Sequence, residues 1–244
     1  MHQNYEFSFR KRNKFIFVPN EDSVRKGEKI LRFFEQNVTF PDYFFHYRKG
    51  GHVAAIHAHI GAPRFFFRLD IQNFFYSISR NRVAAALHDA GFVKARTYAK
   101  WSCVKNPLSI GPQYALPIGF IQSPALASLV LAKSPVRYAI ERAMTQGVKV
   151  SVYLDDLVGS AVDQESLTDA YNDLVSSFYA ANLKPSATKI APPSLAITAF
   201  NCEIRQGFAA VTAVRAAEFH STARSTEATL AFDAYCRSVE VANL

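Results

Sequence analysis

The segment Tyr153-Leu154-Asp155-Asp156 constrains this chain most, because it places two adjacent carboxylates between two runs of β-forming residues. Residues 148–153 are expected to form one strand, and residues 157–162 the strand that returns from a tight turn. Two acids at a hairpin tip repel each other, and a divalent metal ion relieves that repulsion. The dipeptide by itself favours a solvated turn, so a metal site has to be argued from the surrounding segments.

A third acid fits the same site. Asp70 ends the apolar run at residues 65–69, which is expected to be a central strand. Three carboxylates from two strands are the ligand set that two magnesium ions need for in-line phosphoryl transfer, with the metals roughly 4 Å apart. The sequence therefore favours a metal site over a solvated turn.

Size and charge narrow the class of protein. A chain of 244 residues with 49% hydrophobic residues can bury a core and is not a disordered chain. The net charge of +8 suits a polyanion partner, although an ordinary basic protein has the same balance. Basic residues crowd the first 32 positions, and some of the 21 Phe and 11 Tyr are available to stack on bases.

Cysteine usage and hydropathy predict the compartment. Cys103, Cys202 and Cys236 lie far apart and show no zinc-binding spacing, so reduced thiols are expected. The N-terminus lacks the apolar core of a signal peptide, and no apolar run reaches the roughly 18–20 residues that cross a bilayer. We therefore expect a cytoplasmic protein with no membrane partner.

The order of elements predicts an α+β fold. Apolar periodicity and turn residues indicate strands over 5–19, 64–71, 148–153, 157–162, 196–205 and 208–214, and helices over 22–37, 82–90, 122–144, 164–181 and 216–241, the last as one helix or two. Expected N-caps are Asp22, Asn81 and Ser123, the last with Pro124 at the first helical position.

Four segments in one order and spacing carry a family resemblance. They are Arg68-Leu69-Asp70-Ile71-Gln72-Asn73-Phe74-Phe75-Tyr76-Ser77-Ile78, Leu116-Pro117-x-Gly119-Phe120-x-x-Ser123-Pro124, Tyr153-x-Asp155-Asp156 and Asn182-Leu183-Lys184-Pro185-Ser186-x-x-Lys189. With them the chain resembles a bacterial reverse transcriptase of the retron, group II intron-like or defence-associated kind. Lys14-x-Ile16-x-x-Pro19 and His52-x-x-Ala55-x-x-His59 are weaker echoes of the same family.

The resemblance implies the architecture. A right-hand polymerase of fingers and palm is expected, with an antiparallel palm sheet and a thumb that is reduced or missing. The implied domains are fingers over 1–66, the first catalytic palm strand over 67–81, fingers or connector over 82–114, palm over 115–206, and a rudimentary thumb or helix over 207–244.

The resemblance also implies catalytic roles. Asp70 and Asp155 would bind both Mg²⁺ ions, with Mn²⁺ as a substitute, and Asp156 would be a further ligand or a nearby charge. The backbone carbonyl of Ile71 would supply another oxygen. Lys189 would be the general acid for pyrophosphate, or a phosphate contact.

Nucleotide contacts follow from the same motifs. Phe75 would be the steric gate that excludes a 2′-hydroxyl. The alternative is that Phe74 and Phe75 are both core residues, but strand alternation implies that only one of them faces the core. Arg12 and Lys14 would bind the triphosphate, with Arg48, Lys49 and Arg64 as alternatives. Gly119 would allow the backbone to approach the nucleotide or template closely. The residues expected to contact primer or template are Tyr153, Ser123 and Pro124.

One residue departs from the family pattern. Ile118 stands where the family has a Gln that touches the incoming nucleotide, and Gln122 is the residue expected to compensate. His57 and His59 alternate with Ala and have no acid at metal spacing, so a structural role is expected for both.

The favoured function is therefore that of a nucleotidyltransferase: RNA-directed DNA synthesis from dNTPs. The implied partners are a structured non-coding RNA template, the DNA product, and a second copy of the chain or another protein, with a role in antiphage defence. Untemplated or self- or protein-primed DNA synthesis on the same fold is the first alternative. A non-catalytic scaffold that binds nucleic acid is the second, although such a scaffold would be free to lose acids that repel one another.

Overall fold

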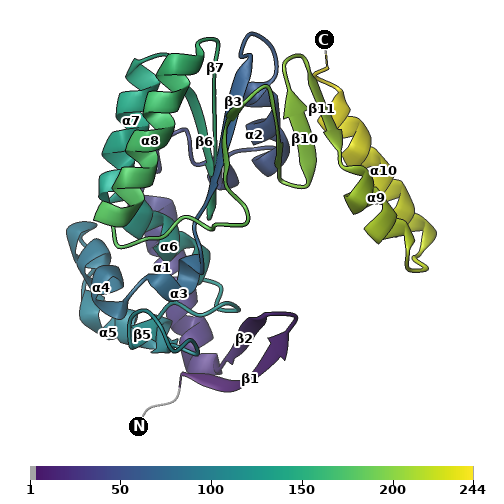
Figure 1. Cartoon of the computed structure of the whole chain (residues 1–244). Helices are drawn as coiled ribbons and strands as arrows, with labels where there is room; N and C mark the ends of the chain where they lie inside the picture. Colours follow the sequence, from purple (N-terminus) through teal and green to yellow (C-terminus); the bar gives the residue numbers. More distant parts are fainter. Residues whose placement is uncertain (1–3, 244) are drawn as a thin grey trace. The chain divides into compact units, whose positions relative to one another are not determined.

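The structure is a computed structural model, and it describes residues 4–243 (Figure 1). The chain divides into two compact units. The first unit holds the residues up to Pro41, Gln72–Arg137 and Ala181–Leu183, and the second holds Asp42–Ile71, Tyr138–Ala180 and the residues from Lys184 onward.

A four-stranded antiparallel sheet forms the centre of the second unit. Its strand order is β6 (Lys149–Tyr153), β7 (Asp156–Ala161), β3 (Phe65–Asp70) and β8 (Ala191–Ser194). Every neighbouring pair is antiparallel. The predicted hairpin around the two acids and the predicted strand that ends at Asp70 are both confirmed.

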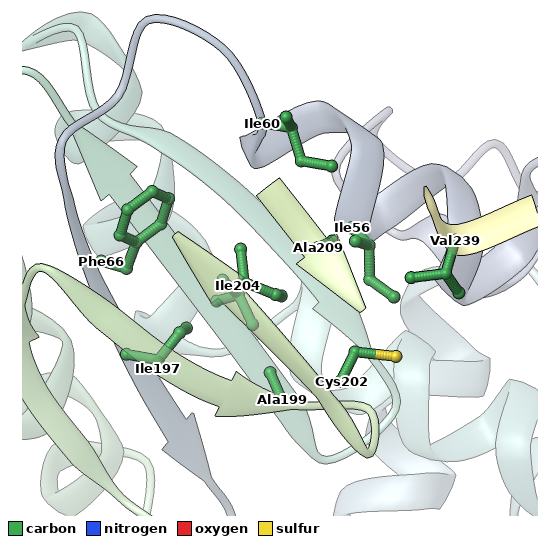
Figure 2. Packing of buried hydrophobic residues seen from close by; sticks show 10 residues of the cluster. Ile56, Ile60, Phe66, Ile197, Ala199, Cys202, Ile204, Ala209 and Val239 are labelled. Atoms are coloured by element: carbon green, nitrogen blue, oxygen red, sulfur yellow. The ribbon is translucent and has the colours of Figure 1, made fainter. Parts of the chain in front are cut away.

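Consecutive phenylalanines of β3 serve the two faces of this sheet. The Phe67 ring lies 5.5 Å from Tyr171 of α8 (Gln164–Ala180), the helix predicted from periodicity. Phe66 points to the other face and belongs to a buried apolar cluster that also contains Ile56 of α2 (Gly51–His59) (Figure 2). Gly159 lies opposite Phe67 in the register, and a Cβ there would overlap the Phe67 ring, so this strand position requires glycine.

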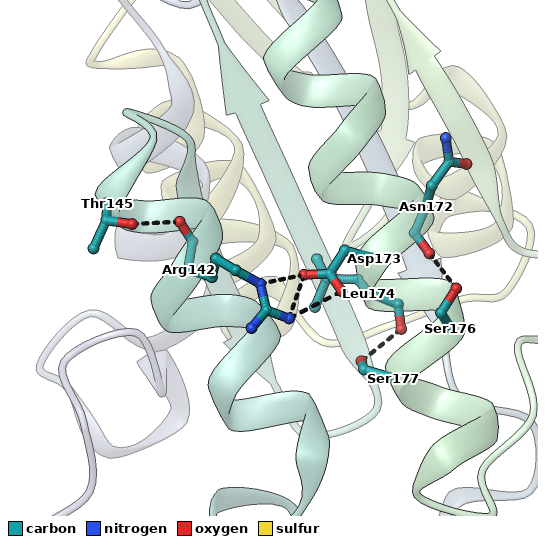
Figure 3. A network of polar contacts seen from close by, with 7 residues as sticks. All are labelled: Arg142, Thr145, Asn172, Asp173, Leu174, Ser176 and Ser177. Atoms are coloured by element: carbon teal, nitrogen blue, oxygen red, sulfur yellow. Dashed lines mark hydrogen bonds and ion pairs between the residues drawn. The ribbon is translucent and has the colours of Figure 1, made fainter.

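Helix α8 is tied to α7 (Pro135–Thr145) by a bidentate ion pair. Arg142 Nε and Nη2 donate to the Asp173 carboxylate at 2.7–3.0 Å (Figure 3).

The prediction of one helix over 122–144 is wrong, because α6 (Ser123–Ala132) ends before α7 begins. Pro135 has no N–H to continue α6, and the Ser134 hydroxyl accepts from the Val136 amide instead.

A three-stranded sheet follows in the second unit. It contains β9 (Ala196–Ala199), β10 (Cys202–Arg205) and β11 (Phe208–Val211) in the order β11-β10-β9. The prediction of one strand over 196–205 is wrong, because Phe200 and Asn201 have φ of 55° and 60° and reverse the chain. The C-terminal region forms two helices, α9 (Ala213–His220) and α10 (Thr226–Glu240), and α10 packs on β11 and α2.

The first unit combines a hairpin with a helical group. The hairpin is β1 (Tyr5–Lys11) and β2 (Lys14–Pro19), and the other elements are α1 (Glu21–Asn37), α3 (Phe74–Ser77), α4 (Arg80–Asp89), α5 (Ala95–Ser102), β4 (Val104–Lys105), β5 (Tyr114–Ala115) and α6.

The predicted N-caps of the first unit are wrong in detail. The cap of α1 is Asn20 rather than Asp22, and the cap of α4 is Ser79 rather than Asn81. In each case the earlier side chain accepts from a backbone amide three residues on and starts the helix sooner. Ser123 is the first residue of α6 and not its cap.

Among the helices of residues 4–243, none combines the length and apolar character that crossing a membrane requires.

Candidate active site

The three predicted acids meet at one end of the four-stranded sheet. Asp70, the last residue of β3, is the direct cross-strand partner of Asp156, the first residue of β7. Tyr153 also pairs with Asp156, so that Leu154 and Asp155 form the two-residue turn between β6 and β7. The Ile71 amide donates to the Asp155 carbonyl at 3.0 Å, which fixes the turn against the end of β3.

The lysine segment docks beside Asp70. The Ser186 amide donates to the Asp70 carbonyl at 2.7 Å, and Pro185 forms a bridge with Ile71. This anchoring brings Lys189 Nζ to 3.0 Å from Asp70 Oδ2. The Asp70 side chain is 3% exposed and that of Lys189 is 51% exposed, so the ammonium links a buried acid to solvent.

Arg68 is a residue of the site to which the sequence analysis assigned no role. Its guanidinium donates from Nε and Nη2 to Asp156 Oδ1, and from Nη1 to the Thr198 carbonyl of β9. The sequence pattern that could have placed Arg68 in the site is the period-2 alternation of β3. Arg68 lies two residues before Asp70 and therefore on the same face of the sheet. A cation at that position is placed to pair with an acid on the neighbouring strand.

Asp155 is the acid whose charge is least compensated. Burial raises its pKa above the ordinary value, and the negative charges of Asp156 and Asp70 raise it further. Burial also raises the pKa of Asp156, but the Arg68 guanidinium partly offsets that effect. Within residues 4–243 the Asp155 carboxylate has no ion-pair partner.

The donor set fits a hard divalent cation. Three carboxylates supply only oxygen ligands, which Mg²⁺ prefers. A cation bound at Asp155 would offset the burial and the neighbouring negative charges that raise its pKa. As the described side chains stand, no three His, Cys, Asp or Glu are gathered around one point. Two of the three acids are paired with cations of the protein: Asp70 with Lys189, and Asp156 with Arg68.

Histidines and aromatic rings support the turn that carries Asp155. His46, in η1 (Phe45–Tyr47), accepts through Nδ1 from the Leu154 amide at 3.4 Å. Burial lowers the pKa of His46 to about 4, which keeps the ring neutral and able to accept. The Tyr153 ring lies 5.7 Å from His46 and 5.9 Å from each of His52 and Phe200. Tyr153 is thus one member of a ring cluster beside the acids.

His59 has the structural role expected from sequence. It is fully buried, and its two ring nitrogens lie 2.7 Å from Ser160 Oγ and 2.8 Å from Ser151 Oγ. Burial lowers the pKa of His59 to about 3. The ring links β6 and β7 beneath the turn. His57 Nε2 lies 3.2 Å from the Val239 carbonyl.

The first unit holds the residues predicted to contact nucleotide. Residues 74–77 form the short helix α3, so the strand alternation applied to Phe74 and Phe75 does not hold there; Phe74 is 3% exposed and Phe75 is partly exposed. Arg12 and Lys14 are exposed at the tip of the β1–β2 hairpin. Gly119 has φ of +114°, and a Cβ there would overlap the Phe17 carbonyl. That carbonyl belongs to β2, which also pairs with Ile118.

Burial separates other first-unit candidates from solvent. Gln122 and Ser123 are each 1% exposed, and the Gln122 amide lies against Gly27 and donates to Ser102 Oγ at 3.3 Å. Gln122 is therefore not positioned to replace the missing glutamine at Ile118. Ile118 itself packs on a buried apolar cluster that contains Phe17, Tyr76, Val104 and Phe120.

Fold and site together define a class of protein: a mixed α/β fold whose antiparallel sheet carries paired acids at the ends of adjoining strands. The family described as "Reverse transcriptase (RNA-dependent DNA polymerase)" matches residues 18–194, and the chain belongs to that family. The prediction made from the four motifs is confirmed.

Individual relatives agree with this assignment. The chain is 32% identical over 121 residues, 48% of its length, to "Retron Ec86 reverse transcriptase" of Escherichia coli. It spans 34% of that relative's length. Two solved structures of foamy viral protease-reverse transcriptase, one with double-stranded DNA and one with an RNA/DNA hybrid, match 92% of the chain with TM-scores of 0.53 and 0.52. At 16% identity, and with 33% and 26% of those chains covered, the match shows the fold alone.

Proposed function

We propose that the chain is an RNA-directed DNA polymerase that adds deoxynucleotides to a 3′-hydroxyl. The observation that carries the proposal is the pairing of Asp70 with Asp156 across β3 and β7, with Asp155 in the adjoining turn. Acids that raise one another's pKa are costly to keep together unless cations are bound between them. Membership of the reverse transcriptase family supports the same reaction.

The acids are assigned to metal ions as follows. Asp70 and Asp155, with the Ile71 carbonyl, would hold two Mg²⁺, and Asp156 would contribute a further oxygen or charge. Bound there, the ions would supply a lower pKa for the primer hydroxyl and positive charge for the triphosphate and pyrophosphate. Lys189, at 3.0 Å from Asp70 and half-exposed, donates a proton or a charged hydrogen bond to the pyrophosphate.

The two compact units are assigned to the polymerase subdomains. We assign the four-stranded sheet of the second unit, which carries the acids, to the palm, and the β1–β2 hairpin of the first unit to the fingers. Phe75 acts as the gate against the 2′-hydroxyl, because its ring keeps an exposed part that the buried Phe74 lacks. Arg12 and Lys14 bind the triphosphate, and Tyr153, with its ring cluster, contacts the primer end. The reduced thumb expected from sequence stays a prediction.

The proposed partners are an RNA template, dNTPs and the DNA product. The motif resemblance implies a structured non-coding RNA as template and a role in antiphage defence, and we include both in the proposal. The net charge of +8 suits binding to such a polyanion.

The test is to purify the protein and measure DNA synthesis on a defined RNA template, with sequencing of the product. Wild type should make DNA complementary to the template in Mg²⁺, and Asp155→Asn should make none. Arg142→Gln is the control, because Arg142 pairs with Asp173 away from the acids. DNA of low complexity with no match to the template would favour untemplated synthesis. Equal incorporation by wild type and Asp155→Asn would refute the proposal.

A further inference from the structure

A groove of about 1310 Å³ lies between α4 and α5 of the first unit. Ala84 and Ala85 of α4 form part of its lining, and so does Val93, which is 77% exposed and precedes α5. Among the described residues, the charged side chains of the lining, histidine aside, are Arg80, Lys94, Arg96, Lys100 and Asp89. The groove therefore combines small apolar side chains with an excess of positive charge.

Three of these cations belong to α5 or to the residue before it. Lys94, Arg96 and Lys100 are exposed, and none of them forms an ion pair within residues 4–243. Arg96 lies in the first turn of α5, where a positive charge opposes the helix dipole, and Lys100 follows four residues later, where like charges repel. An acidic surface laid against α5 would remove both costs.

The start of α8 in the second unit carries an exposed set of acids. Asp163, Glu165 and Asp169 are exposed, and no ion pair holds any of them in the described part of the chain. The next acid along the helix, Asp173, is already paired with α7. Val162, immediately before this set, is 58% exposed. Glu165 and Asp169 are four residues apart and repel each other, so this surface would gain from cations placed against it.

Two segments of eight residues, 93–100 and 162–169, match each other in spacing with opposite charge. In order, the corresponding residues are Val93 and Val162, Lys94 and Asp163, Arg96 and Glu165, and Lys100 and Asp169. A helix begins at the third residue of each segment, so the charges occupy the same turns of α5 and α8. Two such helices lying side by side in the same direction place each cation against an acid and the two valines together. We call residues 93–100 the basic segment and residues 162–169 the acidic segment.

We propose that the basic segment of one copy of the chain binds the acidic segment of a second copy, with α8 lying along the groove between α4 and α5. The valines and the alanine lining supply apolar contact, and the three ion pairs fix direction and register. Formed reciprocally, this contact closes a dimer, and formed head to tail it builds a longer assembly. No acid of the candidate active site takes part, so the inference does not rest on the proposed function.

The matched spacing favours a second copy over a nucleic acid as the occupant. RNA phosphates would neutralise the cations but would leave the exposed Val93 and the acidic segment uncovered. The Phe92 ring in the groove lining is already packed edge to face with Phe33 and Tyr98, at centroid distances of 4.7 and 4.8 Å, so it is not free to stack on bases. The chain itself supplies an acid for each cation of the basic segment.

The test measures the mass of the full chain by analytical ultracentrifugation, after nuclease treatment, over a range of protein and NaCl concentrations. Wild type should associate, with a mass that rises with protein concentration and falls with salt. Arg96→Glu/Lys100→Glu and Glu165→Lys/Asp169→Lys should each weaken association by about a hundredfold or more, because like charges then face each other. The first variant lowers the net positive charge of the chain, so general repulsion between copies cannot explain its loss of association.

Mixing the two variants distinguishes a lost contact from a folding defect. In an equimolar mixture the reversed α5 of one variant meets the reversed α8 of the other, and the two unaltered surfaces also match, so association should return. A misfolded variant would not regain it. Arg25→Glu/Arg32→Glu is the control, because it reverses two charges on α1 that are 70% and 68% exposed and should associate as wild type does.

Three outcomes would overturn the proposal. The first is a wild-type chain that stays monomeric at about 100 μM. The second is a pair of variants that remain monomeric when mixed. The third is an Arg96→Glu/Lys100→Glu variant that assembles as wild type does but binds an RNA oligonucleotide more weakly, which would assign the groove to nucleic acid.

Discussion

Arg68 joins Asp156, the first residue of β7, to the neighbouring three-stranded sheet. Its Nε and Nη2 donate to Asp156 Oδ1 at 2.8 and 2.5 Å, and its Nη1 donates to the Thr198 carbonyl at 3.1 Å. The two side chains are 17% and 20% exposed, so solvent screens this pair less than a surface ion pair. The guanidinium therefore fixes the orientation of Asp156 from two strands at once.

Removing this link should impair DNA synthesis. In Arg68→Gln the Asp156 carboxylate loses two charged donors, and we expect a fall in kcat of roughly tenfold to a hundredfold, as small misplacements of reacting groups produce. Arg68→Lys should restore part of the rate, because an ammonium keeps the charge but lacks the planar fork. Single-turnover kinetics on a primed RNA template measure both. Arg142→Gln, which breaks the exposed Arg142–Asp173 pair, is the control; equal losses in the two Gln variants would contradict a role specific to the site.

The adjacent acids should differ in their effect on stability. Asp155→Asn removes a charge that burial and two other acids oppose, so in metal-free buffer the free energy of unfolding should stay level or rise by about 1 kcal/mol. Asp156→Asn leaves the Arg68 guanidinium without its acid and should cost about 1–3 kcal/mol. Both variants should lose nucleotide incorporation. Chemical denaturation with a chelator present measures the difference, and an Asp155→Asn variant as destabilised as Asp156→Asn would contradict this ordering.

The sequence predicted the acids because their signal is local. Period-2 alternation and the Asp155-Asp156 pair identify the hairpin, and the end of an apolar run identifies Asp70. The direct pairing of Asp70 with Asp156 is a register between distant strands, which depends on how the whole sheet packs. The role of Arg68 does not follow from the sequence, because its partners Asp156 and Thr198 are brought near it only by that packing.

Tertiary contacts also determine the surroundings of Ile118 and Gln122, which the sequence alone could not predict. Ile118 departs from the family pattern, and its side chain packs on a buried apolar cluster beside β2. Gln122 lies against Gly27 of α1, whose missing side chain makes room for the amide. Neither contact leaves a periodic trace in the sequence. The helix starts were missed for a local reason, because Asn20 and Ser79 are competent caps that precede the residues chosen.

Phe75 should control the choice of sugar. Phe75→Ala removes the ring assigned to the space beneath the sugar, and we expect incorporation of ribonucleotides relative to deoxynucleotides to rise by about tenfold or more. Competition between the two nucleotides on one template measures the ratio. Phe74→Ala is the control: Phe74 is 3% exposed, so its loss should cost about 3–5 kcal/mol of stability without changing sugar selectivity. An unchanged ratio in Phe75→Ala would remove the gate assignment.

The buried His59 should make the second unit sensitive to acid. Burial lowers the pKa of His59 to about 3, below its ordinary value of 6.5. The unfolded chain therefore takes up a proton near pH 6.5 that the folded chain refuses, and stability is complete above that pH and declines as the pH falls toward 3. By pH 4 the loss should be on the order of 3 kcal/mol, and His46, with a pKa lowered to about 4, acts in the same direction.

His59→Gln should be less stable at pH 7, because Ser151 and Ser160 lose a shared partner, but its stability should change less between pH 7 and pH 4. Urea unfolding across that range measures both effects, with exposed His88→Gln as the control. Parallel curves for wild type and His59→Gln would show that His59 does not carry the acid sensitivity.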